Sequence, residues 1–359
     1  MKHWQETHRV FEEIAALAAQ GRASALAIIV RLEGSAYRQP GAKLLIRDDG
    51  TMIGNVSGGC LEGDVRERGL KAMRTGASQL PHYDTSGNAD VIWGMGVGCN
   101  GKVDILVVPF TGETEVVRAV RELLKGDQPF ALSAVISPSA LAGRLLVTGP
   151  GRNAGTTGDA KLDREITDRA ARQLGEKQSA SFASSGAEVF TEVLLPPPGV
   201  VVVGAGDDSI PFVRLAAESG FRVTLVDHRP AFLTAERFPD AVRLVQARAE
   251  DPVDLPSNAD TLVVVKAHIL VQDRAWVQRF AATPVPYIGL LGSRSRREDI
   301  LGGLTPDQRS RVYGPVGLDL GAEGPEQVAV SIVAELMAVW ARRAPAHLRD
   351  RKQGIHAGR

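Results

Sequence analysis

The 359-residue sequence has few of the residues that form cross-links or bind metals through sulfur. It contains only two cysteines, Cys60 and Cys99. Two thiols cannot build a disulfide framework or a four-thiolate metal site. The chain also lacks C-x-x-C, H-E-x-x-H, Walker A and G-x-S-x-G spacings. We therefore expect no zinc site, no P-loop and no serine-hydrolase nucleophile.

Net charge and long apolar runs are missing as well. Lysine plus arginine (42) equals aspartate plus glutamate (42), so the formal net charge is zero. Surfaces that bind nucleic acid usually carry a cationic excess, and we expect no such partner. No apolar run approaches the roughly 20 residues that span a bilayer. The opening MKHWQETHRV holds no secretory apolar segment. These absences favour a cytoplasmic protein with reduced thiols and no membrane association.

Glycine, by contrast, is abundant. The chain has 38 glycines, which is more than one residue in ten, whereas about 7% is usual. They follow no G-X-Y period, and the sequence shows no internal repeat. They gather around Cys60, around Cys99, at 204–206, and within 289–303 and 314–324. Because glycine has no side chain, the glycines beside the two thiols indicate room for a ligand to approach the backbone there.

The chain divides at a proline-rich segment. Residues 196–199 read PPPG, which favours stiff extended backbone and lacks amide hydrogens, so this segment is the expected linker. Residues 1–195 predict an N-terminal α+β domain. Residues 200–345 alternate strands with helices, which predicts a Rossmann-like parallel sheet. A basic tail, 346–359, is expected to fray. The predicted fold class is α/β.

Local patterns predict several elements of the first domain. Apolar residues at helical spacing predict a helix over 8–19. Two apolar runs around a DDG turn predict a hairpin with strands 42–47 and 51–54. Residues 114–125 predict a short helix, and GPGRNAGTTG at 149–158 is typical of a loop.

The second half opens on a glycine turn, VVVVGAGDDSIP. Gly204 suits a tight turn, and Gly206 lets a phosphate approach the backbone at a helix N-terminus. Ser209 replaces the third glycine of the usual fingerprint. Asp227 lies 23 residues after Gly204, where an acidic residue meets a ribose hydroxyl. Arg229 could instead contact a phosphate.

Further candidate residues follow the next strands. Lys266 and His268 close the run VVVKAH, and GLLGSRSRR closes the one after it. The carboxyl ends of parallel strands share one edge, where ligands bind. The predicted cofactor-binding residues of this half are Gly204, Ala205, Gly206, Asp208, Ser209, Asp227, Arg229, His268, Gly292, Ser293 and Arg294. Alternatively, the glycines make only a tight turn and the arginines solvate a helix start.

The first half carries the thiols. In NVSGGCLEGDV, Ser57, Gly58 and Gly59 give an exposed backbone and are predicted to bind the cofactor, and Cys60 falls where a helix should begin. The positive end of a helix dipole lowers a thiol pKa and favours thiolate, which Glu62 in the first turn partly opposes. Glycines also frame Cys99, in WGMGVGCNGKV. Two inert buried thiols are the alternative interpretation.

A third polar group precedes these thiols. GSAYRQPGAKLLI places Arg38 and Lys43 on either side of Gly41, around a Pro-Gly turn. A solvated approach to the hairpin explains this pattern without any site.

Several segments together resemble the XdhC/CoxI family of xanthine dehydrogenase accessory factors. In the first half the resemblance rests on PGAKLLIRDDGTMIGNVSGGCLEGDV and GMGVGCNGKV. In the second half it rests on VVVGAGDDSIPFVRLAAESGFRVTLVDHRPAFLTAERFP, PYIGLLGSRSRRE and PVGLDLGAEGPEQVAVSIVAEL. NVSGGCLEGDV and the last of these stretches are specific.

The resemblance implies a maturation chaperone rather than an enzyme with turnover of its own. Such proteins bind the molybdenum cofactor, protect it, promote its sulfuration and pass it to an apo-enzyme. The implied partners are a xanthine dehydrogenase-like molybdenum hydroxylase and a cysteine desulfurase, and a homodimer is an assembly that the resemblance allows.

The resemblance also assigns residues. By motif, Cys60 and Cys99 correspond to the family's paired cysteines, and Gly204 and Gly206 to its nucleotide-type glycines. Many members read close to T-H-D-H where this chain has Lys266-Ala267-His268-Ile269, so a metal or proton-transfer role for this segment is not carried over. The hypothesis is that the Rossmann-like edge holds the phosphate and pterin. Cys60, alone or with Cys99, then contacts molybdenum, a soft metal, or carries a persulfide.

Two other functions remain open on the sequence. An NAD(P)-dependent oxidoreductase explains the glycine turn and Asp227 equally well, with Lys266 and His268 as the nearby acid/base candidates. A nucleotide-sensing structural protein predicts tight dinucleotide binding and no affinity for molybdenum.

Overall fold

The computed structural model describes residues 2–84, 100–126 and 128–351. The chain forms two compact units, Met1–Pro196 and Pro197–Arg359. Among the described residues, no helix combines the length and the apolar character that crossing a membrane requires.

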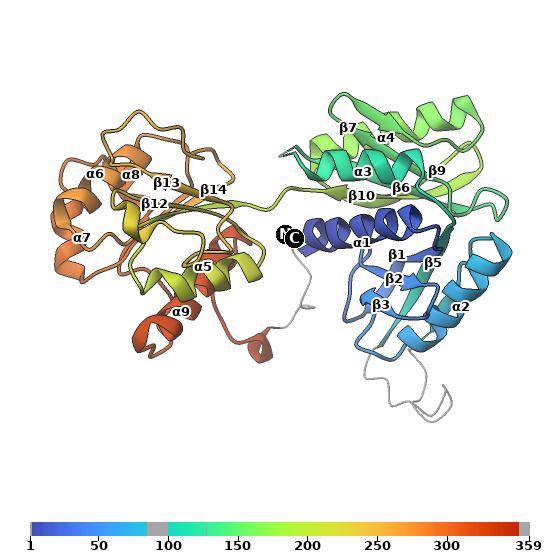
Figure 1. The fold of residues 1–359 in the computed structure, drawn as a ribbon, viewed down its shortest axis with the longest axis horizontal. Coiled ribbons are helices and arrows are strands. Elements are labelled where there is room, and N and C mark those ends of the chain that lie inside the picture. The colour runs from blue at the N-terminus through green and yellow to red at the C-terminus, as the bar shows by residue number, and fades with distance from the viewer. Residues whose placement is uncertain (1, 85–99, 127, 352–359) are drawn as a thin grey trace. The chain divides into compact units, whose positions relative to one another are not determined.

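The first unit contains the same succession of elements twice (Figure 1). The first copy is α1 (Lys2–Ala19), β1 (Ser24–Ser35), β2 (Lys43–Arg47), β3 (Met52–Gly54), α2 (Glu62–Thr75), β4 (His82–Asp84) and β5 (Asn100–Phe110). The second copy is α3 (Glu115–Leu124), β6 (Phe130–Ser137), β7 (Leu145–Gly149), β8 (Arg152–Ala154), α4 (Ala160–Glu176), β9 (Ala180–Ser184) and β10 (Ala187–Leu194).

Sheet topology is duplicated too. The strand orders are β3-β2-β1-β5-β4 and β8-β7-β6-β10-β9, and the pairings within both sheets are antiparallel. The sequence gives no sign of this repeat. The β2–β3 hairpin matches its prediction closely. Strand β8 lies within the segment 149–158 that we expected to be a loop.

Apolar faces hold this unit together. Phe11 and Ile14 of α1, with Val117 and Val120 of α3, pack in one core with the inner sides of both sheets. On the other sides, α2 covers the first sheet and α4 covers the second, as Figure 1 shows. The amphipathic pattern that predicted a helix over 8–19 reflects this burial.

The second unit is a parallel sheet with order β13-β12-β11-β14-β15-β16, which confirms the Rossmann-like prediction. Its strands are β11 (Gly199–Val203), β12 (Arg222–Asp227), β13 (Arg243–Gln246), β14 (Thr261–Val265), β15 (Tyr287–Leu290) and β16 (Val312–Tyr313). Its helices are α5 (Ser209–Glu218), α6 (Leu270–Ala281), α7 (Arg294–Leu301), α8 (Pro306–Ser310) and α9 (Gly324–Trp340), with short 3-10 turns η1 (Pro230–Phe232) and η2 (Leu348–Asp350).

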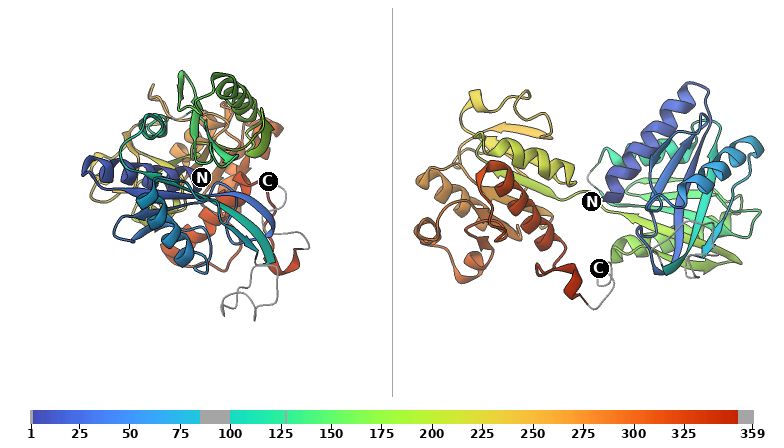
Figure 2. Two further views of the ribbon diagram at one scale, coloured as in Figure 1. Left: turned by 90° about the vertical axis from the view of Figure 1, so that its right-hand side faces the viewer. Right: turned by 90° about the horizontal axis from the view of Figure 1, so that it is seen from below.

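This topology fixes where a ligand can bind. From β11 the chain passes to β12 and β13 on one side, and then returns to build β14, β15 and β16 on the other. The carboxyl ends of β11 and β14 therefore flank the switch point of the sheet, the usual ligand site in such folds. Helix α9 packs beside α5, as the view from below in Figure 2 shows, and its first turn also lies near this edge.

Candidate functional site

Cys60 lies in the loop between β3 and α2, half-buried and free. Gly59 has a φ of 117°, a left-handed conformation that favours glycine. Open space surrounds the positions that Cβ atoms of Gly58 and Gly59 would occupy. Gly58 and Gly59 are exposed, as the glycine pattern predicted, whereas Ser57 is buried, so the prediction of an exposed backbone is wrong for Ser57.

A partly buried polar network shapes this loop. The Glu62 carboxylate accepts the N–H of Val56 at 3.2 Å, the N–H of Ser57 at 2.8 Å and the Ser57 hydroxyl. The Ser57 hydroxyl oxygen accepts the N–H groups of Gly59 at 3.0 Å and Leu61 at 3.1 Å. Burial raises the pKa of Glu62, but the hydrogen bonds from Ser57 and Val56 outweigh it and the pKa is lowered. The charged carboxylate thus stabilises the loop that carries Cys60.

Behind this loop lies a set of buried charges. Arg38 is 5% exposed, bonds both Glu6 oxygens at 2.8 Å, and donates to Asn55 just before the loop. Lys43 is fully buried, with its ammonium 2.5 Å from the Glu192 carboxylate. The interpretation of this turn as a solvated hairpin approach is therefore wrong. Arg38 thus ties the start of the loop, at Asn55, to Glu6 of α1.

The second predicted thiol, Cys99, lies outside the described residues, so the structure does not address its distance from Cys60.

The glycine turn of the second unit is closed by its own side chains. A Cβ on Gly204 would lie 2.5 Å from the Lys266 carbonyl oxygen, so this position requires glycine. The buried Ser209 hydroxyl donates to the Gly204 carbonyl at 2.7 Å. A Cβ on Gly206 would lie 2.7 Å from Asp208 Oδ1. The Asp208 carboxylate therefore occupies space beside the backbone that a phosphate would approach.

The Asp227 carboxylate is likewise already engaged by neighbouring groups of the protein. Its carboxylate accepts the N–H of Ala205 at 2.8 Å and the N–H of Arg229 at 2.9 Å, and pairs with the Arg229 guanidinium at 2.8 Å. Burial raises the pKa of Asp227, but hydrogen bonds from Arg229 and Ala205 outweigh it and the pKa is lowered. The Arg229 guanidinium also lies over the Phe232 ring, 3.9 Å from its centroid. Asp227 thus ties the end of β12 to the glycine turn.

The strand ends β11 and β14 bring together three titratable groups that are distant in sequence. Lys266 is 2% exposed, and its ammonium donates to the Asp208 carbonyl at 2.8 Å and to Asp208 Oδ2 at 3.0 Å. His268 Nε2 lies 3.0 Å from the same oxygen. Burial lowers the pKa of Lys266 against the opposing charge of Asp208. The predicted binding set omitted Lys266, whose pairing depends on the adjacency of β11 and β14.

His268 has a φ of 62°, a left-handed conformation that is rare for residues other than glycine. Such conformations are concentrated at functional sites. At the next strand end, Gly292 precedes Ser293, which caps α7 by accepting the N–H of Arg296 at 3.2 Å. Arg296 pairs at 2.6 Å with Asp273, which is fully buried. Arg294 is exposed.

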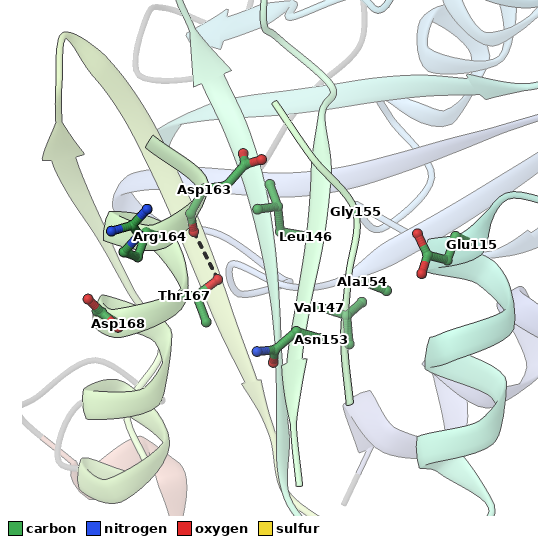
Figure 3. Close-up of a pocket in the computed structure, with 10 residues that line it drawn as sticks. All are labelled: Glu115, Leu146, Val147, Asn153, Ala154, Gly155, Asp163, Arg164, Thr167 and Asp168. Carbon is green, nitrogen blue, oxygen red and sulfur yellow. Dashed lines mark hydrogen bonds between the residues drawn. The ribbon is translucent and has the colours of Figure 1, made fainter. Parts of the chain in front are cut away.

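The described surface includes two pockets of interest. One, of about 360 Å³, lies in the second copy of the first unit, and Figure 3 shows α4 side chains facing Glu115 of α3 across it. Its lining residues are Glu115, Leu146, Val147, Asn153, Ala154, Gly155, Asp163, Arg164, Thr167 and Asp168. The sequence prediction named none of them. The other pocket, of about 200 Å³, lies at the switch point of the second unit.

Comparisons with known proteins agree on one family. Residues 200–336 match the XdhC Rossmann domain, and residues 17–84 match the XdhC and CoxI family. A relative from Bacillus subtilis (strain 168), named as a probable xanthine dehydrogenase subunit, is 36% identical over 317 residues, covering 87% of this chain and 92% of the relative. The molybdenum cofactor insertion chaperone PaoD of Escherichia coli (strain K12) is 22% identical over 325 residues, covering 89% of this chain and 84% of PaoD.

A solved structure resembles most of the chain. The crystal structure described as a xanthine dehydrogenase from Bacillus halodurans has a TM-score of 0.77 and 28% sequence identity, covering 94% of this chain and 97% of that one. Fold and site together define a two-unit α/β protein with a Rossmann-like second unit. The chain belongs to the XdhC/CoxI family, which confirms the resemblance seen in its sequence.

Proposed function

We propose that the protein is a maturation chaperone that binds the molybdenum cofactor as cargo and inserts it into a xanthine dehydrogenase-type molybdenum hydroxylase. The names of two relatives support it, because one refers to xanthine dehydrogenase and the other to a molybdenum cofactor insertion chaperone. The ordered loop around Cys60 is the structural observation that carries the proposal.

The residues around Cys60 suit this cargo. A thiolate is a soft ligand, which a dithiolene-bound molybdenum favours. The thiol is half-buried, and the space beside Gly58 and Gly59 is open. Glu62 holds the loop through hydrogen bonds, so little further ordering is needed when cargo binds. Cys60 would contact the metal, alone or with Cys99.

Sulfuration extends this proposal. A cysteine desulfurase would load a persulfide on Cys60 or Cys99. Its outer sulfur would replace an oxo ligand of the cargo as sulfide, with two electrons from a thiol reductant, while the oxo group leaves as water and the cysteine returns to the thiol. A cytoplasmic location, where thiols stay reduced, fits this chemistry. A homodimer remains a prediction.

The experiment is a reconstitution. The purified chain is loaded with released molybdenum cofactor, freed of excess by gel filtration, and mixed with apo-hydroxylase. We expect hydroxylase activity to rise with the unmodified chain and to stay near background with Cys60→Ser. Glu67→Gln, an exposed change on α2, is the matched control and should support full activity. Full activation by both Cys60→Ser and the Cys60→Ser/Cys99→Ser double variant would overturn the assigned role of the thiols.

An NAD(P)-dependent oxidoreductase is the second candidate, favoured by the switch point and by Asp227 at the end of β12. The charges of the glycine turn argue against it. Asp208 lies against Gly206, and a dinucleotide pyrophosphate there would meet a like charge. Asp227 already bonds Ala205 and Arg229. Saturable NADH binding with substrate turnover would reverse this ranking.

A further inference from the structure

The pocket at the switch point of the second unit has apolar walls and one polar corner. Phe212 of α5, Leu291 after β15, and residues of the first turns of α9 form the walls. Asp208 and Lys266 form the corner. The volume of about 200 Å³ is smaller than the roughly 300 to 1,000 Å³ typical of drug-sized ligands. This pocket therefore suits one flat ring system rather than a whole dinucleotide.

The polar corner offers one donor beside one acceptor. The Lys266 ammonium has three hydrogens, and it donates to the Asp208 carbonyl and to Asp208 Oδ2. Asp208 Oδ2 also lies within hydrogen-bond distance of His268 Nε2. Within the described part of the chain, no hydrogen bond uses the third ammonium hydrogen or Asp208 Oδ1, and the ammonium also lies 5.7 Å from the centroid of the Phe212 ring. Because Lys266 is 2% exposed, a ligand in the pocket is the natural partner for its third hydrogen.

A donor beside an acceptor is complementary to a ring carbonyl beside a ring N–H, the lactam edge of a heterocycle. Lys266 would donate to the carbonyl, and Asp208 Oδ1 would accept from the N–H and from an adjacent amino group. A free anion fits less well, because the Asp208 carboxylate in the same corner would repel it. A ring bearing an amino group in place of the carbonyl would present a donor to the Lys266 ammonium.

We propose that Lys266 and Asp208 bind the lactam edge of a 2-amino-4-oxo bicyclic heterocycle in this pocket. Pterin and guanine share this edge. The pterin source rests on the proposed function, since molybdenum cofactor contains a pterin, whereas guanine would come from a nucleotide. The apolar walls from α5 and α9 contact the ring faces, and the glycine turn need not hold a phosphate.

Titration of the full-length chain tests this proposal. The probes are 6-hydroxymethylpterin, followed by its fluorescence, GMP, and 2,4-diamino-6-hydroxymethylpteridine, which lacks the carbonyl. We expect saturable binding of the pterin and at least tenfold weaker binding of the diamino compound. Lys266→Met and Asp208→Asn should each weaken pterin binding by about tenfold or more, as expected for loss of a charge-assisted hydrogen bond. Tighter binding of GMP than of pterin would assign the site to guanine nucleotides.

The controls separate fold from site. Asp207→Asn changes a neighbouring carboxylate that is 91% exposed and pairs with Arg237, so it should bind pterin normally. Val328→Phe fills the pocket from α9 and leaves the polar corner intact, so it should abolish binding even if Lys266→Met fails to fold. The proposal is overturned if neither heterocycle binds the folded chain. It is also overturned if Val328→Phe and Asp208→Asn leave the binding affinity unchanged.

Loading with molybdenum cofactor, run in parallel, tells the two proposals apart. If retention of the cofactor depends on Cys60 but not on Val328, the proposed heterocycle site in the pocket is wrong, whereas the chaperone proposal is retained. Pterin or GMP binding that depends on Val328, without retention of molybdenum, would support the pocket and contradict the chaperone.

Discussion

Asp163 of α4 repeats the contact of Glu62 of α2, 101 residues earlier in the chain. The Glu62 carboxylate accepts the N–H of Val56 at 3.2 Å, and the Asp163 carboxylate accepts the N–H of Thr157 at 2.7 Å. Each contact joins a helix to the loop that leads into it. The first unit thus duplicates a strand–loop–helix device, and only the first copy carries a cysteine at its centre.

Glu62→Gln should loosen the Cys60 loop. Losing the charge weakens three hydrogen bonds, so we expect the free energy of unfolding to fall by about 1–2 kcal/mol. The Cys60 thiol should react faster with a disulfide reagent, because a nearby negative charge and a fixed loop are both lost. Urea unfolding and thiol kinetics measure these effects in a Cys99→Ser background. Equal thiol rates before and after the change would contradict the assigned role of Glu62.

Asp163→Asn makes the matching change in the second copy. Asp163 also accepts the hydroxyl groups of Thr156 and Thr157, so a similar loss of about 1–2 kcal/mol in stability is expected. The reactivity of Cys60 should not change, because the two loops belong to different sheets. Thiol kinetics that shift as much as in Glu62→Gln would show that the copies are not independent.

Lys43→Met should be severely destabilising. It would leave the Glu192 carboxylate buried without its ammonium partner, which costs about 3–5 kcal/mol. Burial raises the pKa of Glu192, while Lys43 and His3 lower it by more, so the charged form depends on this pairing. The double variant Lys43→Met/Glu192→Leu should recover most of the loss. A double variant as unstable as the sum of both single changes would argue against a paired charge.

Asp227→Asn should reduce stability in a pH-dependent way. Its lowered pKa means that the carboxylate contributes stability above the ordinary aspartate pKa of about 3.9. That contribution is lost as pH falls through the lower pKa of the folded state. We expect a deficit of about 2 kcal/mol at pH 7 that shrinks below about pH 4. The exposed change Asp240→Asn is the control, and a deficit independent of pH would contradict the assigned role of the carboxylate.

The sequence predicted the structural elements that depend on local patterns of residues. The alternation of strands and helices predicted the parallel sheet, and two apolar runs around a turn predicted the β2–β3 hairpin. The duplication was not predictable because the second copy replaces Ser57 with Gly158 and Glu62 with the shorter Asp163, while the contact itself is retained.

Long-range pairing explains the other omissions. Lys43 and Glu192 are 149 residues apart, so a charged residue beside a turn gave no sign of burial. Lys266 likewise meets Asp208 only because β11 and β14 are neighbours. The position of Cys60 before α2 was predictable from the glycines and the helix pattern, whereas the fixing of its loop by Glu62 required the structure.

The most direct test of the chaperone proposal is the amount of molybdenum and pterin that stays with the chain after gel filtration in the presence of released cofactor. The proposal predicts co-elution of both with the unmodified chain and with Glu67→Gln, and loss of most of the metal with Cys60→Ser. If Cys60→Ser and Cys60→Ser/Cys99→Ser each retained as much molybdenum as the unmodified chain, or if the unmodified chain retained none, the proposal would be contradicted.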